Sequence, residues 1–246
     1  MKYIFFDLDD TIIDTNAVNL AIYKKLRRAL NIGASEKKFR MIFRTILKKH
    51  MYRFMDYEIN NSVGIDPIDY YFIDEYEYGD LLGYKEAVFR ELSDAYPDKN
   101  IDKDKLESTL YESRYDYNKV IPGMIEVVSY IKLFAKVGLI TNGILEVQKN
   151  KIEANMLYNH FDDIFISGEY KKGKPNPSFY NEIIKATGAT ADESFMIGDN
   201  INNDYFGAMS VGMNAIYFSN NEVDLDVVRA KSAHEIIKLV LKDIMK

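Results

Sequence analysis

Two carboxylates with one residue between them follow a short apolar run near the start of the chain. The run is residues 2–6, and the segment DLDDT comes next at 7–11. If residues 2–6 form a strand, Asp7 and Asp9 lie in the loop at its carboxyl end, where open α/β sheets bind ligands. One such carboxylate can attack phosphorus while the other transfers protons. The alternative is a capped turn, in which Asp10 or the next residue only satisfies backbone donors.

Two further segments offer groups suited to phosphate. Thr141 and Asn142 stand between an apolar run and Gly143, so a hydroxyl and backbone N–H groups are available to a phosphate oxygen. Lys174 stands in the proline-containing loop GKPNP, where it can be a fixed positive charge. Taken alone, the first of these segments is better explained as an ordinary turn.

A fourth segment, FMIGDNINND at 195–204, supplies more acids. Asp199 ends an apolar run, and Asp204 stands near the start of a helix-like stretch. Carboxylates gathered beside a phosphate form a Mg²⁺ site, because Mg²⁺ prefers oxygen ligands and usually keeps several waters. Since all these segments follow predicted strands, they favour one shared site over coincidence.

The elements expected to position these residues alternate between short apolar runs and helix-like stretches. The runs are too short for helices and are bounded by polar or glycine residues, as in strands buried on both faces of a parallel sheet. The alternation predicts an α/β fold, a doubly wound parallel sheet with a Rossmann-like core. The expected strands are 2–6, 137–140, 164–166, 195–197 and 215–218, and the expected helices are 124–134, 145–155, 178–187 and 204–211.

Residues 16–118 interrupt this alternation. Apolar residues such as Val18, Ile22 and Leu26 recur there at helical spacing, without a convincing buried strand. We therefore expect an α/β core domain made of residues 1–15 and 119–246, with residues 16–118 inserted as an all-helical cap domain.

Two features of the insertion allow a functional and a structural interpretation. The charged residues of 24–53 are eleven Lys or Arg and one acid, and those of 56–80 are eight acids; the basic segment could attract an anionic substrate or partner. Pairing within the insertion and with water is favoured, because exposed charges contribute little. Clustered tyrosines could stack on a base or sugar, but packing between helices is favoured. These tyrosines are Tyr70, Tyr71, Tyr76, Tyr78 and Tyr84.

Composition disfavours several classes of function. A formal net charge of −6 makes general binding of nucleic-acid polymers a poor hypothesis. The absence of cysteine rules out disulfides, thiolate catalysis and zinc–thiolate sites. No apolar stretch approaches the ~18 residues that a membrane span needs, and acids follow the first residues too closely for a signal peptide. We expect a soluble, cytoplasmic protein without a membrane partner or an evident obligate protein partner.

Taken together, these segments resemble the haloacid dehalogenase-like hydrolase superfamily, in the subgroup with a helical cap inserted after the first strand. The resemblance is specific over Ile4–Thr11 and Ile121–Phe218 and weak inside the insertion. It implies that Asp7 is the nucleophile and a metal ligand. Asp9 would be the general acid/base, with its backbone carbonyl also on the metal, and Thr11 would help to orient this loop.

The resemblance also implies roles for the later motifs. Thr141 and the backbone of Asn142 would hold the phosphoryl oxygens, and Lys174 would neutralise phosphate and nucleophile. Asp199 would bind Mg²⁺. Asp204 would orient Lys174 or a water on the metal.

The implied activity is that of a Mg²⁺-dependent phosphatase. It would hydrolyse a small phosphorylated metabolite, a nucleotide or sugar phosphate, through an aspartyl-phosphate at Asp7. Asp9 argues against a dehalogenase and a phosphonate hydrolase, because neither branch has an acid at that position. A sugar phosphomutase stays open, since it shares the core motifs and differs in its cap. A non-catalytic binding protein is disfavoured, because each key acidic and basic position is retained.

Fewer residues indicate which branch of the superfamily the chain resembles than indicate the superfamily itself. The segment 140–143, followed by Gln148 and Lys151, resembles the branch that contains pyrimidine 5′-nucleotidases and N-acylneuraminate-9-phosphate phosphatases.

Overall fold

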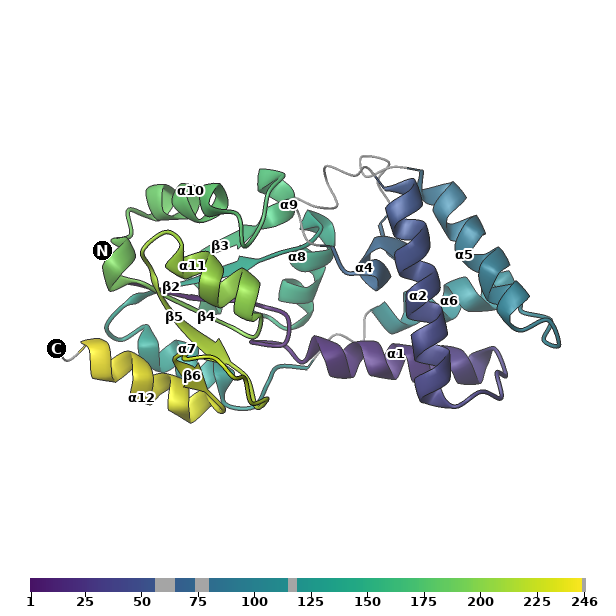
Figure 1. Cartoon of the computed structure of the whole chain (residues 1–246), viewed down its shortest axis with the longest axis horizontal. Helices are drawn as coiled ribbons and strands as arrows, with labels where there is room; N and C mark the ends of the chain where they lie inside the picture. The colour runs from purple at the N-terminus through teal and green to yellow at the C-terminus, as the bar shows by residue number, and fades with distance from the viewer. Residues whose placement is uncertain (56–64, 74–79, 115–118, 245–246) are drawn as a thin grey trace.

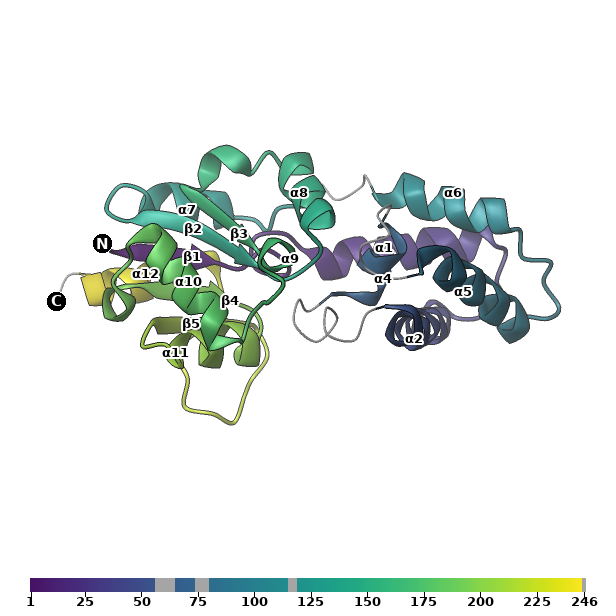
Figure 2. The same cartoon turned by 90° about the horizontal axis from the view of Figure 1, so that it is seen from above.

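The structure, a computed structural model, describes residues 1–55, 65–73, 80–114 and 119–244. Figures 1 and 2 show an α/β unit beside a group of helices, with α1 leading from one to the other. We call these helices the helical unit; they are α1 (Thr15–Ala29), α2 (Glu36–Phe54), α4 (Pro67–Tyr71), α5 (Leu81–Ala95) and α6 (Lys103–Arg114).

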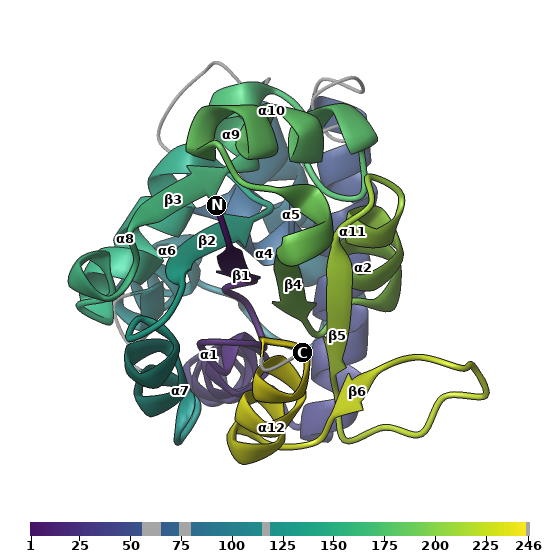
Figure 3. The same ribbon diagram turned by 90° about the vertical axis from the view of Figure 1, so that its left-hand side faces the viewer.

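The α/β unit is built on a six-stranded sheet in the order β3-β2-β1-β4-β5-β6 (Figure 3). All neighbouring strands pair in parallel. The first strand lies in the middle, and the chain order runs in opposite directions on its two sides, so its carboxyl end is a topological switch point. The strands are β1 (Tyr3–Phe6), β2 (Lys136–Thr141), β3 (Asp163–Ile166), β4 (Phe195–Gly198), β5 (Asn214–Phe218) and β6 (Arg229–Ala230).

Helices cover both faces of this sheet. Alternate residues of β1 point to opposite faces, so Ile4 and Phe6 contribute to one hydrophobic cluster and Tyr3 and Phe5 to the other. The Ile4 face packs against α7 (Met124–Ile131) and α12 (Ala233–Ile244), and the Phe5 face against α10 (Pro177–Thr187). This two-sided burial explains why the strands read as unbroken apolar runs.

The remaining short elements connect the strands. They are α8 (Leu145–Ala154), η2 (Tyr158–His160), α9 (Ser167–Tyr170), η3 (Ala191–Glu193), η4 (Ile201–Phe206) and α11 (Gly207–Met209).

One hydrophobic cluster lies mostly in the helical unit. Val18, Ile22 and Leu26 of α1 are buried against Phe43 of α2 and Leu110 of α6, among others, as helical spacing predicted. Ile144 and Val147 of the α/β unit join the same cluster, so it also packs the two units against each other.

Three of the clustered tyrosines are part of this interior. Tyr70, Tyr71 and Tyr84 have no exposed surface, and Tyr84 makes edge contacts with the other two rings. Their burial agrees with the packing interpretation and leaves no face for stacking on a ligand. Tyr76 and Tyr78 lie outside the described residues.

One expectation needs correction, and one pair of elements was not predicted. Residues 204–211 were expected to form one helix, but the structure has the π-helical turn η4 followed by the short α11. Asn200 causes the difference, because its side chain accepts hydrogen bonds from the amides of Asn202 and Asn203 and starts the turn earlier. The terminal pair β6 and α12 was also not predicted.

Among the described residues, no helix combines the length and apolar character of a membrane span.

Candidate active site

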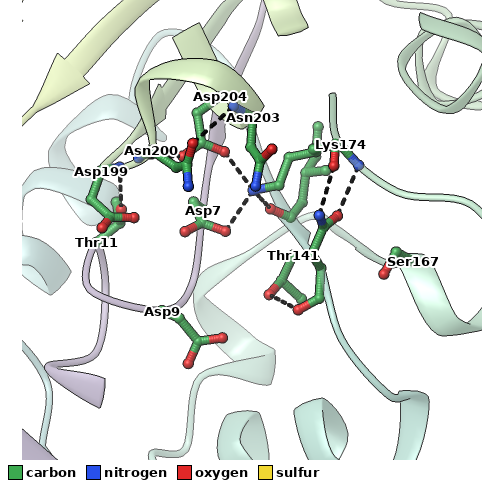
Figure 4. A network of polar contacts seen from close by, with 12 residues as sticks. Asp7, Asp9, Thr11, Thr141, Ser167, Lys174, Asp199, Asn200, Asn203 and Asp204 are labelled. Carbon is green, nitrogen blue, oxygen red and sulfur yellow. Dashed lines mark hydrogen bonds and ion pairs between the residues drawn. The ribbon is translucent and has the colours of Figure 1, made fainter. Parts of the chain in front are cut away.

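The predicted site residues meet at the carboxyl ends of the central strands (Figure 4). Asp7 follows β1, Thr141 ends β2 and Asp199 follows β4. A cavity of about 490 Å³ opens there, lined by these strand ends and by residues of α1, α2 and α4. Parallel pairing therefore gathers segments that are far apart in sequence around one hollow between the two units.

Lys174 is held at the centre of the site. Its Nζ donates to Asp7 Oδ1 at 2.6 Å, to Asp204 Oδ1 at 2.6 Å and to the carbonyl oxygen of Ile140 at 2.9 Å. Burial alone would lower the pKa of Lys174, but the Asp204 and Asp7 carboxylates raise it above its ordinary value. Lys174 is thus a fixed positive charge beside the proposed nucleophile.

Three carboxylates form a cluster that suits a divalent cation. Asp7, Asp199 and Asp204 each place one oxygen within 4.8 Å of the others. Burial raises the pKa of Asp7 well above its ordinary value. The charge of Lys174 opposes this shift, and the carboxylates of Asp204 and Asp199 add to it. Burial and then Asp204 raise the pKa of Asp199 to about 7. A divalent cation would offset this repulsion and lower both pKa values, and an all-oxygen donor set fits Mg²⁺.

Two hydrogen bonds between backbone amides and side-chain oxygens hold the Asp199–Asp204 segment in place. Asp204 Oδ2 accepts from the amide of Asn200 at 2.9 Å, and Thr11 Oγ1 accepts from the amide of Asp199 at 3.1 Å. A Cβ at Gly198 would lie 2.2 Å from Asp204 Oδ2. Glycine is therefore needed at the end of β4 for Asp204 to reach Lys174.

The neighbouring residue Asp10 has a local role. Its φ is 58°, and its carboxylate accepts from the backbone amide of Asn16 at 2.8 Å and from the Asn16 side chain at 2.6 Å. The capped-turn interpretation thus applies to Asp10, while Asp7 and Asp9 are left for other contacts.

Asp9 lies apart from the Asp7 cluster. Figure 4 shows its carboxylate pointing away from Asp7 and Lys174. Burial would raise the pKa of Asp9, but the charge of Lys151 and hydrogen bonds to its carboxylate lower it below its ordinary value. The donors are Thr15 Oγ1 at 2.5 Å, Gln148 Nε2 at 2.8 Å and Lys151 Nζ at 3.0 Å.

Sequence reasoning gave no role to these three donors. Gln148 and Lys151 were singled out for a family likeness alone, although their spacing places both on the same face of α8. Lys151 is almost fully buried, and its Nζ also donates to Asp69 Oδ2 of α4 at 2.9 Å. A polar pair at this spacing, on the helix that follows a site strand, was the signal that could have found them.

The phosphate-binding candidates have contacts of different kinds. The hydroxyl oxygen of Thr141 accepts from Gln148 Nε2 at 2.6 Å. The Asn142 side chain pairs with both backbone groups of Lys174, donating to the carbonyl and accepting from the amide, each at 2.8 Å. The side chain of Asn142 therefore fixes the lysine loop, which leaves its backbone as the part available to a phosphate.

Comparisons with known proteins agree with this architecture. The family model described as haloacid dehalogenase-like hydrolase matches residues 4–218. A glyceraldehyde 3-phosphate phosphatase of Pyrococcus abyssi is 26% identical, over 89% of this chain and 81% of the relative. An N-acylneuraminate-9-phosphatase of Rattus norvegicus is 22% identical, over 98% of this chain and 92% of the relative.

The fold is similar to a solved structure as well. The HAD-hydrolase YfnB from Bacillus subtilis, solved bound to magnesium, superposes with a TM-score of 0.70 at 18% identity, covering 98% of each chain. At this identity the likeness concerns the fold.

Proposed function

This chain belongs to the haloacid dehalogenase-like hydrolase family, and we propose that it is a Mg²⁺-dependent phosphatase. Its substrate is a small phosphorylated metabolite, a nucleotide or a sugar phosphate. The observation that carries the proposal is Lys174, buried and bound to both Asp7 and Asp204 beside the Asp199 carboxylate. Phosphoryl transfer depends mainly on positioning and charge neutralisation, which this arrangement can supply.

Asp7 is the nucleophile in this proposal. One of its carboxylate oxygens attacks phosphorus, the bond from phosphorus to the leaving oxygen breaks, and an aspartyl-phosphate forms. Lys174 offsets the charge that Asp7 and the phosphoryl group bring together, and Asp204 keeps Lys174 in position. Mg²⁺, held by Asp7, Asp199 and the backbone carbonyl of Asp9, would supply further neutralisation.

Asp9 transfers the protons. It protonates the leaving oxygen in the first step and then takes a proton from the water that attacks the aspartyl-phosphate. The attack releases inorganic phosphate and restores Asp7. The backbone of Asn142 and the Thr141 hydroxyl hold the phosphoryl oxygens, and Thr11 orients the loop through the amide of Asp199.

The helical unit acts as the cap. We assign residues 16–118 to it, and residues 1–15 and 119–246 to the α/β core domain. Its residues line the same cavity as the strand ends, so its closure would exclude bulk water and strengthen every charge interaction inside.

The proposed substrate class rests on size and on relatives. A cavity of about 490 Å³ suits a metabolite better than a polymer. Relatives named as phosphatases of glyceraldehyde 3-phosphate and of an N-acylneuraminate 9-phosphate act on small phosphate monoesters. The second of these belongs to the branch suggested by residues 140–151.

The test is hydrolysis of p-nitrophenyl phosphate and a panel of phosphorylated metabolites by purified protein with Mg²⁺. We expect release of inorganic phosphate that Asp7→Asn abolishes. The exposed residue Asp94 on α5 supplies the matched control Asp94→Asn, which should keep full activity. Conversion of a sugar phosphate into its isomer without phosphate release would instead favour a phosphomutase, and no turnover of any phosphate ester would refute the proposal.

A further inference from the structure

One buried ammonium joins the helical unit to Asp9. Lys151 Nζ lies 3.0 Å from Asp9 Oδ1 and 2.9 Å from Asp69 Oδ2. Lys151 is 1% exposed and Asp69 6% exposed. Asp9 belongs to the first loop of the α/β unit and Asp69 to α4, so Lys151 binds one carboxylate from each unit.

The position of Asp69 is fixed by the helical unit. Asp66 caps α4 through the amide of Ile68 at 2.9 Å and pairs with Arg44 of α2 at 3.3 Å. The carbonyl oxygen of Pro67 accepts a hydrogen bond from the Tyr84 hydroxyl of α5 at 3.2 Å. Because α4 is tied to both α2 and α5, the contact between Asp69 and Lys151 depends on where the helical unit lies.

Lys151 in turn restrains one side of Asp9. Oδ1 of Asp9 accepts from Lys151 and Thr15, while Oδ2 accepts from Gln148. A buried ammonium is costly to leave partly paired. Loss of Asp69 would remove a carboxylate that binds Lys151 Nζ, so Lys151 would shift and the orientation of the Asp9 carboxylate would change with it.

We propose that Lys151 and Asp69 are positioning residues that couple docking of the helical unit to the orientation of Asp9. The inference rests on the proposed phosphatase activity, in which Asp9 is the acid/base. In this inference neither residue transfers a proton or forms a bond to phosphorus. Lys151 acts on Asp9 directly, and Asp69 acts on Asp9 through Lys151.

The leaving group of the substrate can separate a positioning role of Lys151 and Asp69 from a merely structural one. An alkyl phosphate has a poor leaving group that needs protonation by Asp9, whereas p-nitrophenolate leaves without it. Because kcat/KM reports the steps up to formation of the aspartyl-phosphate, disordering Asp9 should lower kcat/KM for the alkyl ester more than for the aryl ester. A merely structural ion pair would lower both values in parallel.

The experiment compares Lys151→Gln and Asp69→Asn with exposed controls on the same elements or unit, Lys149→Gln on α8 and Asp94→Asn on α5. The substrates are glycerol phosphate and p-nitrophenyl phosphate with Mg²⁺. We expect the alkyl-to-aryl ratio of kcat/KM to fall about 100-fold in Lys151→Gln and about 10-fold in Asp69→Asn, within the usual range of acid/base catalysis. The control variants should keep the wild-type ratio.

Two further variants sharpen the result. If Asp69 acts through Lys151, the double variant should have the ratio of Lys151→Gln alone, since the effects of coupled residues do not add. Lys151→Arg keeps the charge and should retain more of the alkyl activity. Thermal unfolding of every variant separates loss of fold from loss of positioning.

Several outcomes would overturn the inference. An unchanged ratio in Lys151→Gln would show that Lys151 has no effect on Asp9. A changed ratio in Lys151→Gln with a wild-type ratio in Asp69→Asn would remove the coupling to the helical unit. If the wild-type protein hydrolyses neither ester nor any other phosphate, the proposed function itself is wrong, which is a different result from an active enzyme whose variants keep the ratio.

Discussion

The Lys174 ammonium and the Asp204 carboxylate lie 2.6 Å apart, and both side chains are nearly fully buried. Removing the charge of Asp204 leaves Lys174 with Asp7 as its acidic partner within hydrogen-bond distance. Breaking a buried pair on one side typically costs about 3–5 kcal/mol. We expect Asp204→Asn to lower the free energy of unfolding by an amount near the lower end of that range, measured by urea denaturation.

The same substitution should reduce kcat, because Lys174 loses the contact that orients it. The exposed residue Asp226 offers a matched control, and Asp226→Asn should change neither property. Wild-type stability and activity in Asp204→Asn would contradict the role of Asp204 as the support of Lys174.

Gly198 should be essential for activity because any side chain there would collide with Asp204. A Cβ added there would lie 2.2 Å from Asp204 Oδ2, whereas a Cβ at Gly33 would have no atom within 4 Å. Gly198→Ala must displace Asp204 and should therefore lower phosphatase activity at least about 10-fold, since an ångström-scale misplacement can cost 10²-fold. Gly33→Ala should leave activity unchanged. Equal activity of the two variants would argue against the close approach at β4.

Asp7 and Asp9 should fail in different ways when changed to asparagine. Asp7→Asn lacks the nucleophile, so no covalent phosphoenzyme should form. Asp9→Asn keeps the nucleophile and can be phosphorylated by p-nitrophenyl phosphate, but it cannot activate water for the second step. Because acid/base catalysis is worth about 10²–10⁴-fold, phosphoenzyme should accumulate in Asp9→Asn.

The measurement is the mass of the intact protein after a rapid acid quench. A phosphoryl adduct on Asp7→Asn, or fast turnover without an adduct by Asp9→Asn, would show that the two carboxylates are wrongly assigned.

Mg²⁺ should support activity and Ca²⁺ should inhibit it. Ca²⁺ takes more oxygen ligands at longer distances and can bind a carboxylate through both oxygens, which would leave Asp7 without a free nucleophile. Hydrolysis of p-nitrophenyl phosphate is titrated with each ion after dialysis against EDTA. Full activity in EDTA, or equal rates with both ions, would exclude the metal assignment.

Binding of Mg²⁺ should strengthen as the pH rises from 6 to 8. The pKa of Asp199 is raised to about 7 and that of Asp7 is also raised, so below pH 7 a larger share of these carboxyls carries a proton. A bound cation must displace those protons, so the affinity falls at low pH and protons are released on binding. Calorimetry at pH 6 and pH 8 in buffers of different ionisation enthalpy measures both effects. A pH-independent affinity would contradict the prediction.

The sheet could be predicted because its strands are buried on both faces. Tyr3–Phe6 and Phe195–Gly198 have unbroken apolar sequences typical of strands in a parallel sheet, and the acids after them indicated the site. The short β6 has two residues and gives no such pattern. The turn at Ile201–Phe206 depends on side-chain capping by Asn200, which helical periodicity does not reveal.

The surroundings of Asp9 were harder to predict than those of Asp7. Lys174 stands in a recognisable loop, whereas Lys151 lies within a helix and becomes part of the site only through contacts with Asp9 and Asp69. The spacing of Gln148 and Lys151 could have indicated a shared helix face, but the contact of Lys151 with Asp69 depends on how the two units dock. The clustered tyrosines of the helical unit were easier to interpret, since packing between helices was the favoured interpretation and the structure buries Tyr70, Tyr71 and Tyr84.

The central position of β1 has a consequence for how the chain folds. Tyr3 pairs with Lys136 and Ile4 with Phe195, so the first strand to be synthesised must wait for partners that come much later in the chain. The helices between β1 and its partner strands make contacts closer in sequence and can form before β1 pairs. Contacts of such long sequence separation are slow to form, and an apolar strand left unpaired meanwhile is prone to aggregate. Rapid collapse of the helical unit would shorten the effective loop between β1 and β2 and so lower the entropic cost of closing the sheet.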